Sequence, residues 1–127
     1  MKTFAKTALF ILVGAAFLLG ACTKQGGFIN VASGGTSGTY YALAGAMAKV
    51  WNEKIPGMNA TVQSTGASVA NINLLKEGKV DLIFVQNDIA YYAMNGLEMF
   101  KDNSYSEIQG LAVLYSETCQ LVTLANS

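Results

Sequence analysis

Short apolar runs rich in β-forming residues alternate along this chain with segments of helical periodicity, and this alternation restricts the fold more than any other feature. The first three runs are Phe28–Ala32, Ala60–Gln63 and Val80–Val85, and a polar loop follows each of them. Two further strands are expected at Leu111–Tyr115 and Cys119–Leu124. A β-α-β-α-β-α-β order predicts an α/β fold in which helices cover a parallel or mixed sheet.

The segments between the runs predict three helices. Apolar residues recur at intervals of three and four over residues 40–51, so the first helix should end near Glu53. A second apolar face spans residues 69–75, and Gly78 is expected to cap that helix. The third helix is expected over residues 88–95. Each helix therefore begins just after a loop that leaves the carboxyl end of a strand.

The first 21 residues have the three-part order of a secretory signal. Lys2 and Lys6 precede an uncharged apolar run, Ala8–Leu19, and small residues follow it. The run is shorter than the roughly 20 residues that cross a bilayer, which favours a cleavable signal over a transmembrane helix. We therefore expect residues 1–21 to be a signal peptide and residues 22–27 to be a tether.

Residues Leu19-Gly20-Ala21-Cys22 resemble the lipobox of bacterial lipoproteins. The resemblance implies that Cys22 is lipidated and becomes the first mature residue. Acyl chains such as palmitate would then hold the protein on the extracytoplasmic side of a bacterial membrane. The alternative is a plain secretory cut at which Cys22 is incidental. Loss of Lys2 and Lys6 with the signal leaves six lysines against eight acidic residues, so the net charge becomes −2.

The composition argues against several classes of function. The sequence contains no His and no Arg, and only 13% of its residues are charged. Without His, the usual Ser-His and Cys-His nucleophile pairs and His-based metal sites cannot form. The neutral balance also argues against a nucleic-acid binder. We therefore expect no cofactor, no metal and no enzymatic activity; an α/β enzyme domain that uses Asp88 or Tyr40 as acid or base is the weaker alternative.

Three loops carry most of the candidate binding groups. In open parallel sheets ligands collect at the carboxyl ends of strands, where helix N-termini also direct free N–H groups outward. Glycines in these loops allow close backbone approach, and hydroxyl groups add neutral donors. The hydroxyl groups belong to Thr36, Thr39, Ser64 and Ser68. Such loops suit a small carboxylate, although the same serines and threonines, and Asp88, can also be plain helix caps.

Three motifs occur in a fixed order along the chain: Gly35–Tyr41 (GTSGTYY), Gln63–Ser68 (QSTGAS) and Gln86–Tyr92 (QNDIAYY). Together they resemble the solute-binding receptors of tripartite ATP-independent periplasmic (TRAP) transporters of the TAXI family. The resemblance covers roughly Phe28 to Ser127. It implies a type II periplasmic-binding-protein fold, in which two α/β lobes close on a small organic acid or amino acid such as glutamate, glutamine or 2-oxoglutarate. The receptor would deliver this solute to a TRAP membrane permease. The ligand-binding positions that the resemblance implies are Thr36, Thr39, Tyr40, Ser64, Gly66, Ala67, Ser68, Gln86 and Asp88.

The chain departs from that family in its length. The family's receptors are far longer and have two lobes, so residues 28–127 are expected to be a truncated form, the N-terminal lobe only. Without the second lobe we expect weak or absent solute binding. A truncated, non-binding surface lipoprotein is the alternative interpretation.

Overall fold

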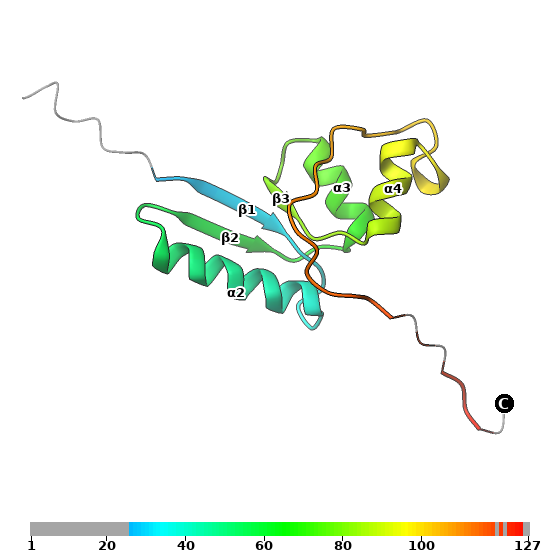
Figure 1. Ribbon diagram of the computed structural model, residues 1–127, viewed down its shortest axis with the longest axis horizontal. Helices are drawn as coiled ribbons and strands as arrows, with labels where there is room; N and C mark the ends of the chain where they lie inside the picture. Colours follow the sequence, from blue (N-terminus) through cyan, green and yellow to red (C-terminus); the bar gives the residue numbers. More distant parts are fainter. Residues whose placement is uncertain (1–25, 119, 121, 126–127) are drawn as a thin grey trace, which may run out of the picture. The chain divides into compact units, whose positions relative to one another are not determined.

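The computed structural model describes residues 26–118, 120 and 122–125 (Figure 1). The expected signal peptide, Cys22, most of the tether and Cys119 lie outside the described residues. The chain divides into two compact units, one up to Tyr91 and one from Tyr92 onward. The first unit contains the sheet and all three candidate loops.

The first unit is built on a three-stranded parallel sheet. Its strands are β1 (Phe28–Ala32), β2 (Asn59–Gln63) and β3 (Leu82–Ile83). They lie in the order β2-β1-β3, so β1 is central and pairs in parallel with both neighbours (Figure 1). Ala32 pairs with Gln63 on one side and with Ile83 on the other, which aligns the carboxyl ends of the three strands. The predicted α/β fold with a parallel sheet is confirmed.

Strand β3 is shorter than the predicted Val80–Val85 because a side chain replaces part of its ladder. The Asp81 carboxylate accepts the backbone N–H of Asn30 at 2.8 Å, where a neighbouring strand would offer a carbonyl. Backbone bonds still flank the strand, from Asp81 N–H to the Asn30 carbonyl at 2.9 Å and from Phe84 N–H to the Ala32 carbonyl at 3.0 Å. The segment therefore follows β1 over more residues than the two that form the regular strand.

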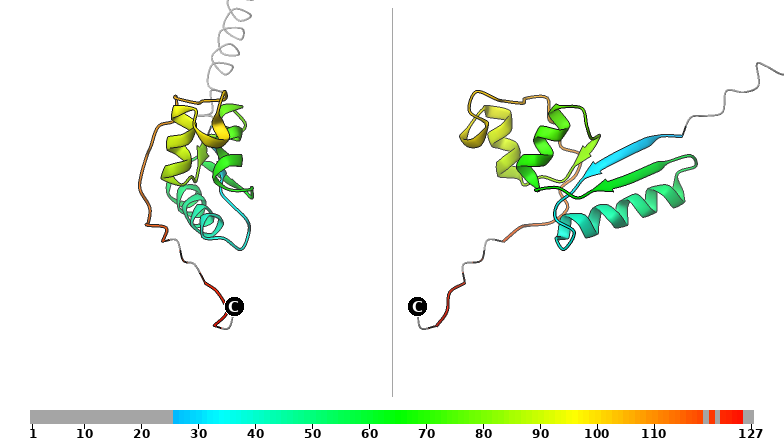
Figure 2. Two further views of the ribbon diagram at one scale, coloured as in Figure 1. Left: turned by 90° about the vertical axis from the view of Figure 1, so that its right-hand side faces the viewer. Right: turned by 180° about the vertical axis from the view of Figure 1, so that it is seen from behind.

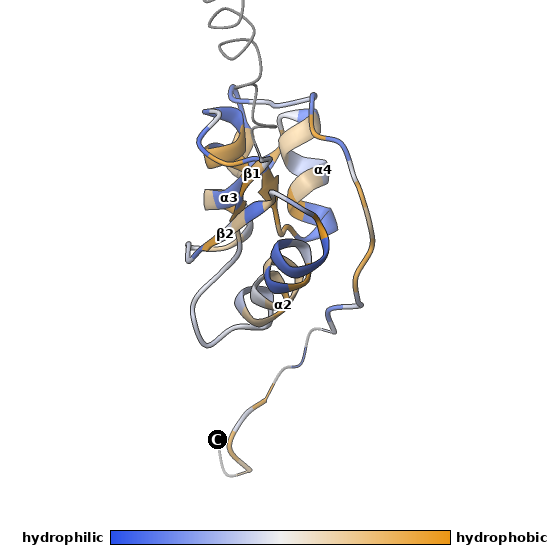
Figure 3. Ribbon diagram, turned by 90° about the vertical axis from the view of Figure 1, so that its left-hand side faces the viewer, coloured by the Kyte–Doolittle hydropathy of each residue, from blue (hydrophilic) through white to orange (hydrophobic). Residues whose placement is uncertain are grey.

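The helices begin within one residue of their predicted positions. They are α2 (Thr39–Lys54), α3 (Ser68–Lys76) and α4 (Asn87–Asn95), of which α4 continues into the second unit. Leu43, Met47 and Trp51, four residues apart on α2, pack against a core that contains Val31 and Phe84. Figure 3 shows apolar residues in β1 and a mixture of polar and apolar residues on α2, as an amphipathic covering helix requires. Among the described residues, no helix is long and apolar enough to cross a membrane.

Gly78 ends α3 as predicted. It has a φ of +66°, and its N–H donates to the Leu75 carbonyl at 3.0 Å. The next N–H, that of Lys79, donates to the Leu74 carbonyl at 2.9 Å. These two bonds form a Schellman motif, which satisfies the last carbonyls of the helix and turns the chain toward β3.

The second unit has little regular structure among its described residues. It contains the end of α4 and a short 3-10 helix, η1 (Glu98–Phe100). The predicted strand at Leu111–Tyr115 is wrong: residues 101–118 form neither helix nor strand, and Val113 is 96% exposed. An apolar run becomes a strand only where a second backbone pairs with it, and the described sheet contains β1–β3 alone. The other predicted strand, Cys119–Leu124, is described only in part, and its described residues are not in a strand either.

Candidate functional site

The three predicted loops leave the sheet at one edge. Because Ala32 pairs with both Gln63 and Ile83, the loops start from adjacent and aligned strand ends (Figure 2). The structure thus brings together three motifs that are far apart in the sequence, as the parallel topology predicts. We name them loop 1 (residues 33–38), loop 2 (residues 64–67) and loop 3 (residues 84–86).

Four hydrogen bonds join the start of loop 1 to the end of β2 and the start of loop 2. The backbone N–H and the hydroxyl group of Ser33 both donate to the Gln63 carbonyl, at 3.0 and 2.8 Å. In the reverse direction, the Thr65 N–H and the Ser64 hydroxyl donate to the Gly34 carbonyl, at 3.2 and 3.0 Å. The two loops therefore extend the β1–β2 pairing beyond the strands. Ser64 is an exposed residue, and its hydroxyl proton is used in the bond to the Gly34 carbonyl.

Ser68 holds loop 3 in place. Its Oγ atom accepts the backbone N–H of Gln86 at 3.0 Å, and the residue is only 6% exposed. Ser68 is thus the first residue of α3 and also the anchor of the loop that leads into α4. Sequence reasoning placed both residues in one binding site, and the structure shows a direct bond between them.

Asn71 links all three loops, and sequence reasoning missed it. It is fully buried in α3, and its Nδ2 atom donates to the carbonyls of Ser33 and Phe84 at 2.6 and 2.7 Å. Its Oδ1 atom lies 2.5 Å from the Thr65 hydroxyl, which also accepts the N–H of Ala67 at 3.1 Å. The available signal was an amide beside the apolar positions of a helix, because a buried polar side chain at such a place must find partners.

Neither α2 nor α3 begins with a side-chain cap. The N-cap residues are Gly38 and Ala67, and neither helix start receives a hydrogen bond from a capping side chain. The interpretation of Ser and Thr as plain caps therefore does not describe these two helix starts. The first N–H groups of a helix carry the positive end of its dipole, which favours a negative charge nearby. At α4, the Asp88 carboxylate accepts the N–H of Ile89 at 2.8 Å.

The backbone at Ala67 has a conformation that normally requires glycine. Its φ is 64° and its ψ is −149°, a region that costs a non-glycine residue on the order of 1–3 kcal/mol. The bond from its N–H to the Thr65 hydroxyl holds this conformation. An added Cβ on the neighbouring buried Gly34 would lie 3.9 Å from the Ala67 Cβ, so loops 1 and 2 approach closely here. The strained residue lies within the candidate site, where such conformations tend to occur.

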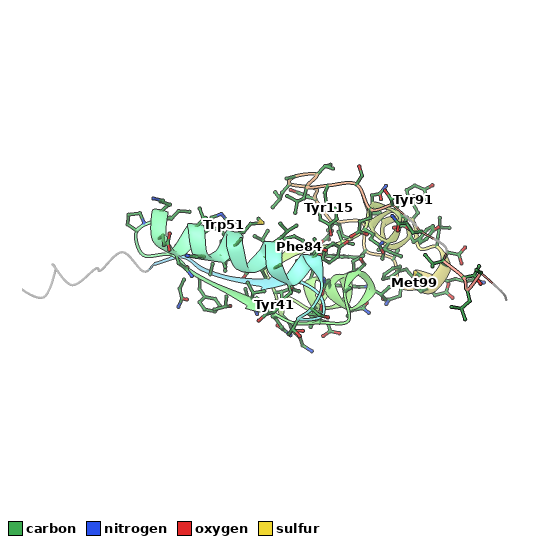
Figure 4. All side chains as sticks on the ribbon, turned by 90° about the horizontal axis from the view of Figure 1, so that it is seen from below. Tyr41, Trp51, Phe84, Tyr91, Met99 and Tyr115 are labelled. Carbon is green, nitrogen blue, oxygen red and sulfur yellow. The ribbon has the colours of Figure 1, made fainter. Side chains whose placement is uncertain are left out.

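The predicted site residues differ in their exposure. Six are exposed: Thr36, Thr39, Ser64, Gly66, Gln86 and Asp88. Tyr40 and Ala67 are half-buried, and Ser68 is buried. The Tyr40 ring packs against Phe84 with 5.4 Å between ring centroids, and Figure 4 shows Phe84 near the first turns of α2. Tyr40 therefore supports the core beneath the loops.

Comparison with known families identifies the chain. Residues 31–127 match the model of the NMT1-like family, and the match includes all three loops. The chain belongs to the NMT1-like family. This family is periplasmic-binding-protein-like, so membership gives the chain a solute-binding role and agrees with the expected class of fold. It is a family of binding proteins, which favours that role over catalysis.

The loops of this NMT1-like protein offer almost no charge. Within loops 1–3 and the first turns of the helices that follow them, Asp88 is the one charged residue. The lysines of the described part of the chain lie elsewhere, at Lys49, Lys54, Lys76, Lys79 and Lys101. The sequence has no Arg. An anion held by these loops would therefore be bound by neutral N–H and hydroxyl donors. In the described part of the chain, no three acidic, His or Cys residues gather to hold a metal.

Proposed function

We propose that this NMT1-like protein is the solute receptor of a TRAP transporter of the TAXI type. Its solute is a small carboxylate such as glutamate, glutamine or 2-oxoglutarate. The observation that carries the proposal is the convergence of loops 1–3 at one sheet edge, where α2 and α3 begin without side-chain caps. Helix N-termini of this kind bind carboxylates through their first N–H groups.

The site residues divide into donors and supports under this proposal. The exposed hydroxyl groups of Thr36 and Thr39 lie beside the start of α2 and donate to the solute carboxylate. Gln86 and Asp88, both exposed at the start of α4, supply an amide and a carboxylate for the rest of the solute. Ser68 acts through the backbone of loop 3, since its Oγ accepts the Gln86 N–H.

Gly66, Ala67, Ser64 and Tyr40 complete the proposed site by shape and backbone. Gly66 is exposed, and the absence of a side chain there lets a solute approach the backbone of loop 2. Ala67, with its strained backbone, is the N-cap of α3 and joins loop 2 to the helix. Ser64, Gly66 and Ala67 thus form the surface on which the solute carboxylate rests, and Tyr40 supports the core beneath it.

The test is titration of the 15N-labelled chain with glutamate and with 2-oxoglutarate up to the order of millimolar concentration, which detects even weak binding. We expect the amide signals of loops 1–3 and of the first turns of α2 and α3 to shift on addition of the solute. The amide signals at the start of β2 should keep their positions. The dimethyl esters of both solutes, which lack the carboxylate charges, should leave the spectrum unchanged. Absence of any shift would mean that the chain itself binds none of these solutes, in agreement with the non-binding alternative.

A matched pair of threonine variants tests the site assignment. Thr39→Val removes one exposed hydroxyl at the start of α2 and should weaken carboxylate binding about tenfold. Thr61→Val makes the same change in the middle of β2, away from the loops, and should leave affinity unchanged. Equal affinities of the two variants would remove loop 1 from the site.

We also propose that lipid on Cys22 anchors the receptor on the extracytoplasmic side of a bacterial membrane, beside its permease. The support is the lipobox-like sequence that precedes Cys22. Labelled palmitate should enter the wild-type protein during expression in bacteria and be absent from Cys22→Ala. Labelling that survives the substitution would place any lipid elsewhere and contradict the anchor.

A further inference from the structure

A single buried amide contacts a residue of every loop. Ser33 begins loop 1, Phe84 begins loop 3, and both direct their carbonyls at Nδ2 of Asn71. Thr65 of loop 2 places its hydroxyl on Oδ1 of the same side chain. The three loops therefore share one fixed point, the side chain of Asn71.

The contacts use the particular chemistry of an amide. Nδ2 has two protons, and the two carbonyls at 2.6 and 2.7 Å take both of them. Oδ1 is an acceptor and meets the Thr65 hydroxyl. An apolar residue of similar size would fill the volume but remove the two hydrogen bonds from Nδ2, which leaves the Phe84 carbonyl without this donor and is costly. The Thr65 hydroxyl and the Ser33 carbonyl would keep their own contact at 3.2 Å. A carboxylate would direct a negative charge at two carbonyl oxygens.

We infer that Asn71 is a positioning residue that sets the relative geometry of loops 1, 2 and 3 and, through them, the affinity for solute. The second part of this inference rests on the proposed function, and the first part does not. Ser68, on the same helix, complements Asn71, because its Oγ atom accepts the Gln86 N–H and so fixes loop 3. Helix α3 thus acts as the frame of the site, and Asn71 touches no solute itself.

Asn71→Asp gives a readout that a merely structural role would not produce. Its ionised form repels the Ser33 and Phe84 carbonyls, whereas its protonated form donates one hydrogen bond and restores part of the contact. Burial and the two carbonyls disfavour the ionised form, so the pKa of the new carboxyl is raised. The groups around it are the Thr65 hydroxyl and the carbonyls of Ala32, Ser33 and Phe84, none of which titrates near neutral pH. The charged residues at the end of α3, Lys76 and Glu77, are exposed.

The experiment compares amide hydrogen exchange and solute titration in the full chain, each relative to wild type at the same pH. At neutral pH, Asn71→Asp should speed exchange of the Ser33, Thr65 and Gln86 amides about tenfold more than that of α2, and weaken solute binding about tenfold. Both effects should diminish as the pH is lowered through the raised pKa. Thr65→Val, which removes only the hydroxyl, is the milder second variant and should loosen loop 2 at every pH.

The control is Ile72→Ala, a cavity in the next residue of α3, which is also fully buried. It should speed exchange across the lobe evenly and show no recovery at low pH. The inference is overturned if Asn71→Asp and Thr65→Val behave like Ile72→Ala, or if the loops keep wild-type exchange in both. If wild type binds no solute, the proposed function fails for this chain, while the exchange data still decide whether Asn71 positions the loops.

Discussion

The Oγ atom of Ser68 accepts the backbone N–H of Gln86 at 3.0 Å, so one predicted ligand residue fixes the position of another. Ser68 is buried and Gln86 is exposed. Under the proposed function, the serine acts on a solute through the loop that it holds, while the glutamine lies at the surface. Sequence motifs of a binding site can thus mix groups that contact the ligand with groups that hold the contacting groups.

Removal of the Ser68 hydroxyl should destabilise the lobe and loosen loop 3. Ser68→Ala leaves the Gln86 N–H without its acceptor, and we expect a loss of about 1–2 kcal/mol in the free energy of unfolding, measured in urea. Ser37→Ala, an exposed serine in loop 1, is the control and should change stability by less than about 0.5 kcal/mol. Equal stabilities would show that water replaces the Ser68 contact at no cost.

The elements of the first unit were predictable because their signals are local. Strand β1 was expected at Phe28–Ala32 and lies there. In α2, apolar residues recur every three or four positions, and this spacing places Met47 and Trp51 against the core. Gly78 marks the end of α3 by its own conformational freedom. The convergence of the loops followed from the parallel order of the strands.

The parts that sequence reasoning missed depend on contacts between distant residues. The local pattern showed that Asn71 is an amide beside apolar positions, but not that its partners are Ser33 and Phe84, which lie 38 and 13 residues away. The uncapped helix starts were equally hidden, because loop 1 contains residues able to cap. At Leu111–Tyr115 the local pattern was that of a strand, and the described sheet offers it no partner. Local pattern predicts an element only where a neighbour can pair with it.

The strain at Ala67 should be relieved by glycine. Ala67→Gly removes the Cβ at a φ of 64° and ψ of −149°, and the gain exceeds the added chain entropy, so we expect stabilisation by about 1 kcal/mol. Ala70→Gly, in the body of α3, is the control and should destabilise by about 1 kcal/mol. Urea unfolding of both variants checks the opposite signs. A loss of stability in Ala67→Gly would show that the Cβ makes contacts that outweigh the strain.

Two Gly→Ala substitutions should also have opposite effects. Gly78 has a φ of +66° in the Schellman motif, so Gly78→Ala should destabilise by about 1 kcal/mol. Gly45 lies within α2, and an added Cβ there meets nothing within 4 Å, so Gly45→Ala should stabilise by roughly 0.5–1 kcal/mol. The midpoint of thermal unfolding should therefore be higher than wild type for Gly45→Ala and lower for Gly78→Ala. The reverse order would contradict both the left-handed conformation of Gly78 and the open helical position of Gly45.

Asn52 provides a way to change stability without touching the loops. Its side-chain amide pairs with both backbone groups of Ala60: Oδ1 accepts the N–H at 2.6 Å, and Nδ2 donates to the carbonyl at 3.0 Å. The side chain thus replaces a neighbouring strand at the open edge of β2. Asn52→Ala leaves both groups of the buried Ala60 without these partners and should cost about 2 kcal/mol of unfolding free energy.

Because Ala60 lies near the start of β2, at the opposite end from loop 2, Asn52→Ala should keep wild-type solute affinity in the folded lobe. Val50→Ala, an exposed change on the same helix, should alter unfolding by less than about 0.5 kcal/mol and serves as the control. Calorimetry and urea unfolding on the same samples separate the two quantities. A fall in affinity together with stability would mean that the sheet transmits strain from its amino end to the loops, and that stability and binding are coupled in this lobe.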